Sequence, residues 1–220
     1  MRLLVLGSPG VGKGTYTQEL VKLFDLQHIS TGDIFRENIK NKTNLGKQVE
    51  SCIAAGKLVS DDLTIALVRE RLNARKDNFI LDGFPRTIAQ AEALDTMIKI
   101  DLVINFKAER NVIIDRLSGR RVCKSCGWIY HTKHLLPQVE NKCDHCGEDL
   151  FHRPDDFPEA ISKRLDTYEK ETMPLIDYYT RKGVLKAVVV NEDFGSHKEM
   201  IMERITKVIK STDFNKDNLR

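Results

Sequence analysis

The sequence has no long hydrophobic run and no marked excess of charge of either sign. Its 220 residues include 35 Lys and Arg against 32 Asp and Glu, so the formal net charge is only +3. Such a balance gives no electrostatic reason to expect binding to nucleic acid or to an anionic membrane. The apolar run that begins at Leu3 is broken by Gly7 and Pro9, which leaves it too short for a signal sequence or a membrane span. We therefore expect a cytoplasmic protein without nucleic-acid or membrane partners.

Internal repeats and low-complexity linkers are absent too, and 220 residues are enough for one good core with an inserted module. Short apolar runs at residues 3–6, 79–81, 102–106 and 185–190 are each followed by a segment with the helical spacing of apolar residues. This alternation is typical of an α/β fold in which helices cover a parallel sheet. Phosphate sites in such sheets lie beyond the carboxyl ends of the strands.

A glycine-rich loop, Gly7-Ser8-Pro9-Gly10-Val11-Gly12-Lys13-Gly14-Thr15, follows the first apolar run. The next segment has the apolar spacing of a helix, so the predicted order is strand, glycine loop, helix. Backbone N–H groups of such a loop, the N-terminus of the helix and the Lys13 ammonium together favour the phosphates of a nucleoside triphosphate. The general phosphate-loop pattern has Ser or Thr directly after the lysine, whereas here Gly14 intervenes and Thr15 comes one residue later.

A carboxylate, Asp82, ends the second buried run. In this position beside a phosphate loop, a carboxylate holds Mg²⁺, usually through water. Gly83 and Pro85 are expected to shape a turn that lets Arg86 face the same site. The segment therefore predicts a second wall of the nucleotide site.

Residues 30–59 are expected to form a small helical insertion. Ser30, Thr31 or Asp33 can cap its first helix. Arg36 lies on that helix and would point back toward the start of the helix, where it is a candidate anion ligand.

Cysteine is sparse, with five residues, but four of them form two Cys-x-x-Cys pairs that are sixteen residues apart: Cys123, Cys126, Cys143 and Cys146. Two such knuckles place four thiolates tetrahedrally, so zinc is the expected metal, and iron in a rubredoxin-like site is the alternative. Four cysteine ligands leave no coordination position open, which predicts a structural metal. Cys52 is expected to be a small buried apolar residue, and His131, His134 and His145 are expected to have packing or surface roles.

The glycine loop, Ser30-Thr31-Gly32-Asp33, Leu58-Val59-Ser60-Asp61-Asp62 and Asp82-Gly83-Phe84-Pro85-Arg86 together resemble the adenylate kinase family. The resemblance continues through Arg120-Arg121, Arg153-Pro154-Asp155-Asp156 and Arg164-Leu165, so it covers nearly the whole chain. It implies a P-loop core at residues 1–29, 60–119 and 154–220, an AMP-binding insertion at residues 30–59 and a mobile, zinc-ribbon-like lid at residues 120–153. It also implies a monomer that catalyses Mg²⁺-dependent, reversible phosphoryl transfer, in which ATP and AMP give two ADP.

The same resemblance implies the role of each site residue. The transferred phosphoryl group would be surrounded by Lys13, Asp82, Arg86, Arg120, Arg153 and Arg164. ATP would be held by Gly10, Val11, Gly12, Lys13, Gly14, Thr15, Arg120, Ile129 and Tyr130. AMP would be held by Thr31, Arg36, Lys57, Leu58, Val59, Gly83, Phe84, Pro85, Arg86, Gln90, Arg153 and Arg164.

The sequence departs from the family pattern at two places. Asn191-Glu192-Asp193 replaces the usual Asp-Gly turn of the donor-base loop, so the base of the donor stays open, whereas Ser60 replaces a common proline and is expected to alter only the stiffness of its loop. A kinase for another nucleoside monophosphate, or an AMP kinase that uses GTP, is the nearest alternative. A more distant one is a nucleic-acid-binding zinc-ribbon ATPase. Against it, the only aromatic residues between the two knuckles are Trp128 and Tyr130, without a run of Lys and Arg between them.

Overall fold

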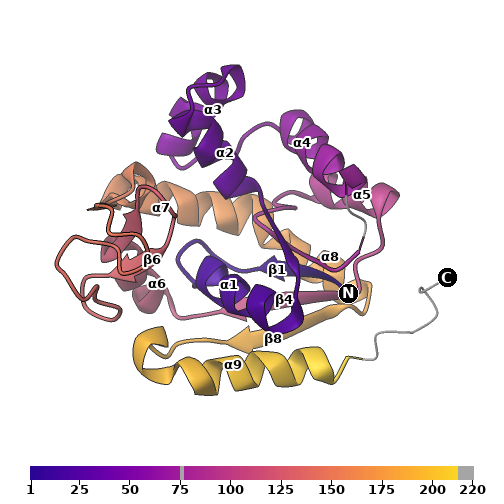
Figure 1. The fold of residues 1–220 in the computed structure, drawn as a ribbon. Coiled ribbons are helices and arrows are strands. Elements are labelled where there is room, and N and C mark those ends of the chain that lie inside the picture. Colours follow the sequence, from indigo (N-terminus) through magenta and orange to yellow (C-terminus); the bar gives the residue numbers. More distant parts are fainter. Residues whose placement is uncertain (75–76, 213–220) are drawn as a thin grey trace.

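A five-stranded parallel sheet forms the centre of the protein in the computed structural model, which describes residues 1–74 and 77–212 (Figure 1). The strands are β1 (Arg2–Leu6), β2 (Gln27–Ser30), β3 (Phe79–Asp82), β4 (Leu102–Lys107) and β8 (Leu185–Val189). Their order across the sheet is β2-β3-β1-β4-β8, and every neighbouring pair is parallel. The predicted parallel α/β fold is confirmed.

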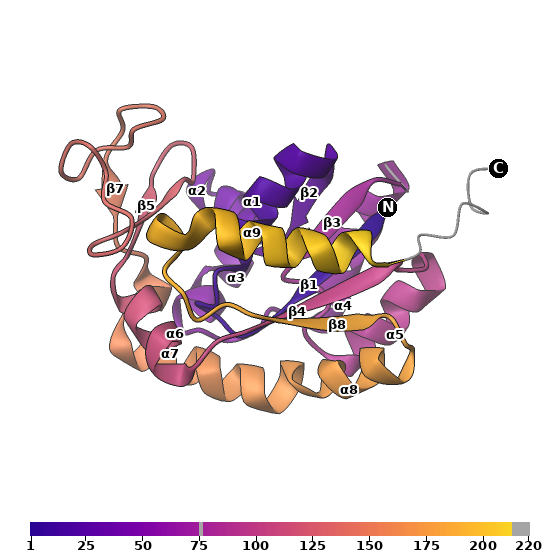
Figure 2. The same ribbon diagram turned by 90° about the horizontal axis from the view of Figure 1, so that it is seen from below.

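Helices bury both faces of this sheet (Figure 2). One face is covered by α1 (Lys13–Phe24) and α9 (Phe194–Lys210), and the other by α4 (Asp61–Ala74), α5 (Ile88–Met97) and α8 (Pro174–Arg181). In β1, Leu3 and Val5 pack toward the first set of helices, whereas Leu4 and Leu6 pack toward the second. A central strand that is buried on both faces has to be apolar at every position, which explains the continuous run at residues 3–6.

The segment between β2 and α4 folds into two helices that stand away from the sheet (Figure 1). They are α2 (Thr31–Lys40) and α3 (Asn44–Ala54). The Ser30 hydroxyl accepts a hydrogen bond from the Asp33 N–H at 3.2 Å, so Ser30 caps α2. The two helices cross closely at Gly46, where an added Cβ would lie 2.1 Å from the Asn38 carbonyl oxygen. The Cys52 thiol is half-buried and donates a hydrogen bond to the Leu58 carbonyl oxygen at 2.9 Å. Our expectation that Cys52 is a buried apolar residue is therefore wrong.

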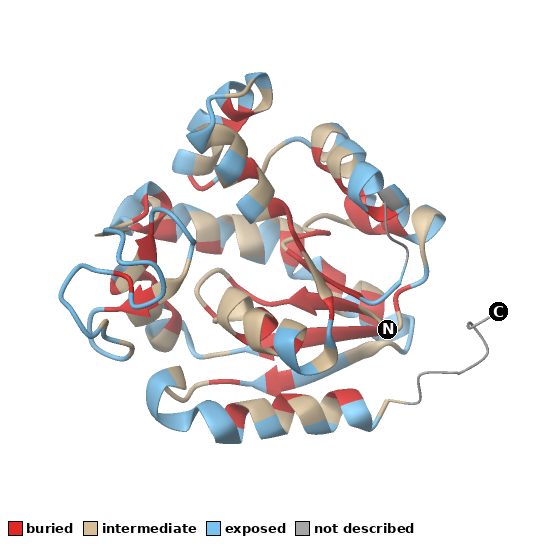
Figure 3. Cartoon of the chain, in the orientation of Figure 1, coloured by how far each residue is buried: buried red, intermediate tan, exposed pale blue. Residues whose placement is uncertain are grey.

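A small three-stranded antiparallel sheet forms the second module. Its strands are β5 (Arg120–Cys123), β6 (Ile129–His131) and β7 (Leu150–Phe151), in the order β6-β5-β7. Its buried cluster contains only Cys123, Tyr130 and Cys143, with Trp128 and Leu150 packed against it. The loops of the module are largely exposed (Figure 3). Since it buries so little apolar surface, the module needs a cross-link to hold its shape.

Four further elements lead into and out of this module: α6 (Arg110–Ser118), η1 (Pro154–Asp156), α7 (Pro158–Thr167) and the π-helical turn η2 (Tyr168–Thr172). Pro174 has no N–H to continue the helical ladder, and just before it the Met173 N–H donates to the Tyr168 carbonyl oxygen, five residues back. Among residues 1–74 and 77–212, no helix is long and apolar enough to cross a lipid bilayer.

Candidate active site

The glycine loop connects β1 to α1 and holds the Lys13 side chain folded back over it. Gly12 has φ +105°, a left-handed conformation that favours glycine, and α1 begins at the next residue. Lys13 Nζ donates to the carbonyl oxygens of Gly7 at 2.6 Å and Ser8 at 2.9 Å. Burial lowers the pKa of Lys13 to about 7, although the nearby Asp82 carboxylate acts in the opposite direction. The ammonium is therefore enclosed, and a bound anion would stabilise its charged form.

Asp82 lies beside this loop because of the sheet register. It is the last residue of β3 and pairs with Val5, next to the end of β1 where the loop begins. It is 9% exposed, and its Oδ2 lies 3.7 Å from His28 Nε2. A buried carboxylate next to a phosphate loop is a suitable anchor for a hydrated Mg²⁺ ion, so the position fits the expected ion.

Asp156 holds two of the predicted arginines in place. Its fully buried carboxylate accepts two hydrogen bonds from Arg120, at 2.7 and 2.6 Å, and one from Arg164 at 2.8 Å. Arg164 also contacts Asp155 Oδ2 at 3.0 Å. Neither aspartate is among the site residues that we expected from the sequence. The available signal was an Asp-Asp pair directly after Arg153-Pro154, in a segment already predicted to supply arginines.

Among the residues that the structure describes, Arg86 and Arg153 lack the close carboxylate partners that Arg120 and Arg164 have in Asp156. Arg86 Nε donates to the Gly83 carbonyl oxygen at 2.9 Å, and burial, together with the charge of Arg164, lowers the pKa of Arg86 to about 10. Arg153 is 8% exposed, and its Nε atom has no hydrogen-bond partner in the described part of the chain. Burial, followed by the charges of Arg120 and Arg36, lowers the pKa of Arg153. A polyanionic ligand would offset the cost of collecting these charges.

Two adjacent cavities meet at this group of charges. The first extends from the glycine loop to the lid and is lined by Gly10, Gly12, Lys13, Gly14, Thr15, Asp82, Arg120, Ile129, Tyr130 and Arg153, among others. The second lies under the helical insertion and is lined by Thr31, Lys57, Val59 and Gln90, among others. Both are lined by Arg36, Leu58, Gly83, Arg86 and Arg164. The arginines at this boundary can therefore contact ligands in both cavities.

Two predicted site residues line neither cavity. Val11 is fully buried, and its carbonyl oxygen accepts a hydrogen bond from Arg116 at 2.8 Å. Phe84 is 1% exposed and packs in the core on the α4, α5 and α8 face of the sheet. Their side chains support the two loops from behind, so any contact with a ligand has to come from the backbone.

The lid residues Ile129 and Tyr130 differ in how they meet the first cavity. A Cβ added at Gly14 would lie 3.6 Å from Ile129 Cδ1, so Ile129 covers the start of α1. Tyr130 lines the same cavity, but its hydroxyl accepts a hydrogen bond from the Asp144 N–H at 2.7 Å and lies 3.6 Å from Cys143 Sγ. Tyr130 therefore connects the cavity wall to the cysteine cluster.

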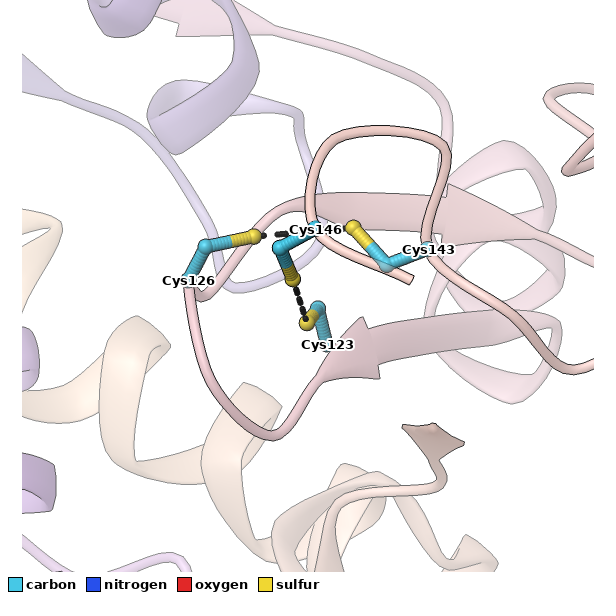
Figure 4. Close-up of side chains that lie close together, drawn as sticks. All are labelled: Cys123, Cys126, Cys143 and Cys146. Atoms are coloured by element: carbon cyan, nitrogen blue, oxygen red, sulfur yellow. Dashed lines mark hydrogen bonds between the residues drawn. The ribbon is translucent and has the colours of Figure 1, made fainter. Parts of the chain in front are cut away.

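The four predicted metal ligands are brought together (Figure 4). All four sulfurs lie within 4.8 Å of one another, with Cys123 and Cys146 separated by 3.4 Å and Cys126 and Cys143 by 3.5 Å. Gly127 and Gly147 both have φ +74°, so each knuckle closes through the same turn. Tetrahedral zinc with Zn–S bonds of about 2.3 Å requires sulfurs roughly 3.7 Å apart, so the donor set fits this ion.

Three groups of contacts join the lid to the rest of the protein. The Asp115 carboxylate on α6 accepts from Lys133 Nζ at 2.9 Å and lies 2.7 Å from His134 Nε2. The Lys22 ammonium lies 5.0 Å from the centre of the Trp128 ring. Lys40 Nζ of α2 donates to the carbonyl oxygen of Lys124 in the first knuckle at 3.1 Å. The lid therefore packs against α1, α2 and α6, and it supplies part of the wall of the first cavity.

His131 completes a second group of possible metal ligands with Asp115 and His134. However, His131 Nδ1 accepts hydrogen bonds from the N–H groups of Lys133 and His134, which leaves its proton on Nε2, 3.1 Å from the Asp115 carbonyl oxygen. Burial lowers the pKa of His131, which favours this neutral form. Since Nε2 is a donor here, the group acts as a lid contact, in agreement with the predicted packing role.

The loop predicted to adjoin the donor base is fixed by Arg116 of α6. Its Nη2 atom donates to the carbonyl oxygens of Val190 at 2.9 Å and Glu192 at 2.6 Å. Asp193 caps α9 by accepting from the N–H groups of Gly195 and Ser196. Asp193 and Gly195 line the first cavity, on the side where it adjoins His134.

Taken together, a parallel sheet, a glycine loop with a folded-back lysine and converging arginines define a P-loop protein of the phosphotransferase class. A family model described as Adenylate kinase matches residues 5–184. An adenylate kinase of Treponema denticola is 54% identical over 92% of this chain and 96% of that protein. Adenylate kinases of Caldicellulosiruptor bescii and Caldanaerobacter subterraneus are 46% and 47% identical, over 93% and 95% of this chain and 99% and 96% of those proteins. The chain belongs to the adenylate kinase family.

Proposed function

We propose that this protein transfers the terminal phosphoryl group of ATP to AMP, reversibly and with Mg²⁺, to give two ADP. The observation that carries the proposal is the placement of Arg86 and Arg164 in the walls of both cavities. Two nucleotides that occupied the two cavities would bring their phosphates together at these arginines. In-line transfer between two bound phosphates requires alignment and charge neutralisation, and it needs no protein nucleophile.

The residues of the first cavity would bind the donor. The loop residues 10–15 would surround the donor phosphates with N–H groups, and Lys13 would follow the charge of the migrating group. Arg120 and Arg164 are held from behind by Asp156, so they can neutralise charge without reorganising during the reaction. Asp82 would anchor Mg²⁺ through water, and the ion would neutralise charge on the phosphates.

The second cavity would bind AMP. Its walls include Thr31, Gln90 and residues 57–59 of the insertion, and Arg36 lies where the two cavities meet. Burial of both nucleotides under the lid and the insertion would exclude water, which is the competing acceptor of the phosphoryl group. We propose accordingly that residues 30–59 and 120–153 move relative to a core formed by residues 1–29, 60–119 and 154–220.

The cysteine cluster would hold one structural Zn²⁺ through Cys123, Cys126, Cys143 and Cys146. Zinc would stabilise the lid by cross-linking two knuckles that bury little apolar surface. With four sulfur ligands the ion would have no open position for substrate. We further propose that the enzyme is a cytoplasmic monomer with the substrates ATP, AMP and ADP, and without nucleic-acid or membrane partners.

The decisive experiment is a coupled assay with each pair of a donor, ATP or GTP, and an acceptor, AMP, CMP, UMP or GMP. The proposal predicts rapid turnover with ATP and AMP and slow turnover with the other pairs. Transfer from GTP at the rate of ATP would identify the alternative GTP-using enzyme. Lys13→Met should nearly abolish turnover in a chain that remains folded, because Lys13 would act mainly in the transition state. Full turnover by a folded Lys13→Met protein would refute the proposed site.

A further inference from the structure

A partly buried hydrogen-bond chain lies behind the second cavity and connects two helices. Gln90 of α5 is 2% exposed, and its carboxamide lines that cavity. Gln90 Nε2 donates to Asp61 Oδ1 at 2.7 Å, and Gln90 Oε1 accepts from the Arg86 N–H at 2.8 Å. The other carboxylate oxygen of Asp61 accepts from the Thr87 hydroxyl at 3.0 Å. Asp61 is the first residue of α4 and is not itself part of the cavity wall.

The partners of this carboxamide fix which end is nitrogen and which is oxygen. A carboxylate only accepts hydrogen bonds, and a backbone N–H only donates them. If the amide turned over, its oxygen would face the Asp61 carboxylate and its NH₂ would face the Arg86 N–H. Both hydrogen bonds would be lost and replaced by repulsive contacts in a buried place.

The fixed amide presents a defined pattern to the cavity. A carboxamide has two N–H donors and two acceptor positions, and each partner uses one of them. One donor and one acceptor therefore remain for a ligand. The Watson–Crick edge of a 6-aminopurine complements this pair, because its exocyclic NH₂ donates and its N1 accepts. A 6-oxopurine has the reverse pattern, with an acceptor at O6 and a donor at N1.

We infer that Asp61 is a positioning residue that fixes the polarity of the Gln90 carboxamide and so selects 6-aminopurine over 6-oxopurine monophosphates. The inference rests on the proposed function, in which the second cavity binds the acceptor nucleotide. Asp61 acts through Gln90 and does not touch the substrate. Selection by a buried amide of fixed polarity is strong, because the wrong base leaves buried polar groups unpaired.

The test compares AMP with IMP, which differs from AMP only at the 6-position, as acceptors of phosphoryl groups from ATP. Asp61→Asn keeps the shape of the side chain but supplies an amide that can donate as well as accept, so only the Arg86 N–H still opposes turning over of the Gln90 carboxamide. We expect the AMP:IMP ratio of kcat/KM to fall about tenfold or more, which corresponds to one buried hydrogen-bond mismatch. The change should come from KM, with kcat for AMP within about threefold of the wild type. Titration calorimetry of AMP and IMP without donor should show the same fall in the ratio of Kd values.

Asp62→Asn is the matched control. Asp62 is the exposed neighbour of Asp61 in the first turn of α4, so its substitution removes the same charge from the same helix end. The AMP:IMP ratio of this variant should equal that of the wild type. In a Gln90→Ala background, Asp61→Asn should no longer change the ratio, because the residue through which Asp61 acts is missing.

Three results would overturn the inference: an AMP:IMP ratio within twofold of the wild type in active Asp61→Asn, an equal effect of Asp62→Asn, or an undiminished effect of Asp61→Asn in the Gln90→Ala background. Should Asp61→Asn melt below the assay temperature, Asp61→Ser removes the same charge and is judged by the same ratio. A wild type that does not phosphorylate AMP at all would instead refute the proposed function, so the two failures are distinguishable.

Discussion

Binding of ATP should be accompanied by uptake of a proton at Lys13. In the free protein, burial lowers the pKa of Lys13 to about 7, so at pH 8 about 0.9 of the molecules have a neutral Lys13. Triphosphate charge placed against Nζ favours the ammonium form and raises this pKa well above 8. Each ATP bound at pH 8 should therefore take up about 0.9 proton at this residue. At pH 6, where Lys13 is already protonated, the uptake should fall to about 0.1.

Isothermal titration calorimetry measures this directly. The binding enthalpy of Mg·ATP is determined at pH 8 in buffers of different ionisation enthalpy. The slope of the binding enthalpy against the ionisation enthalpy of the buffer gives the number of protons exchanged. Lys13→Met is the control, because it removes this titrating group and leaves the remaining groups of the site in place. The difference in slope between the wild type and this variant isolates the contribution of Lys13.

Two results would refute the reasoning. If the wild type and Lys13→Met showed the same slope at pH 8, Lys13 would already be charged in the free protein, and its burial would have no effect on its pKa. If the uptake were as large at pH 6 as at pH 8, a group other than Lys13 would be accepting the proton. A slope that decreases from pH 8 to pH 6 in the wild type alone is the expected outcome.

Three further predictions concern the arginines and the cysteines. Arg86→Ala should lower kcat in the coupled assay about 10³-fold, because Arg86 lies where the two cavities meet. An effect on KM alone, with kcat unchanged, would show that Arg86 only binds substrate. Asp156→Asn should lower the free energy of unfolding in urea by about 3–5 kcal/mol, since it removes the buried negative charge that Arg120 and Arg164 share, and a loss below about 1 kcal/mol would contradict this. Cys143→Ser should lower the Tm and the zinc content measured by mass spectrometry while turnover persists at temperatures where the chain is folded. Lost turnover with an unchanged melting curve, or no metal in the reduced wild type, would contradict a structural zinc site.

The sequence alone was sufficient for the elements whose signals are local. The run at residues 3–6, the glycine loop and Lys13 are contiguous, so their spacing already specifies strand, loop and helix. The two Cys-x-x-Cys knuckles are short closed turns, and each carries a glycine at the position where the backbone has φ +74°. Such features depend on neighbours a few residues away, and the structure reproduces them.

What only the tertiary structure decided are the contacts between segments far apart in the chain. Asp61 and Asp62 are equivalent in the sequence, yet only the Asp61 carboxylate reaches Gln90, 29 residues away, because of the way α4 packs against α5. Asp156 binds Arg120 across 36 residues, and the lid sheet places the two together. Phe84 belongs to a predicted loop motif but is buried in the core, because it packs among the residues that α4, α5 and α8 bury against the sheet. Local spacing determines which face of an element a side chain occupies, whereas the packing of that face determines its partner.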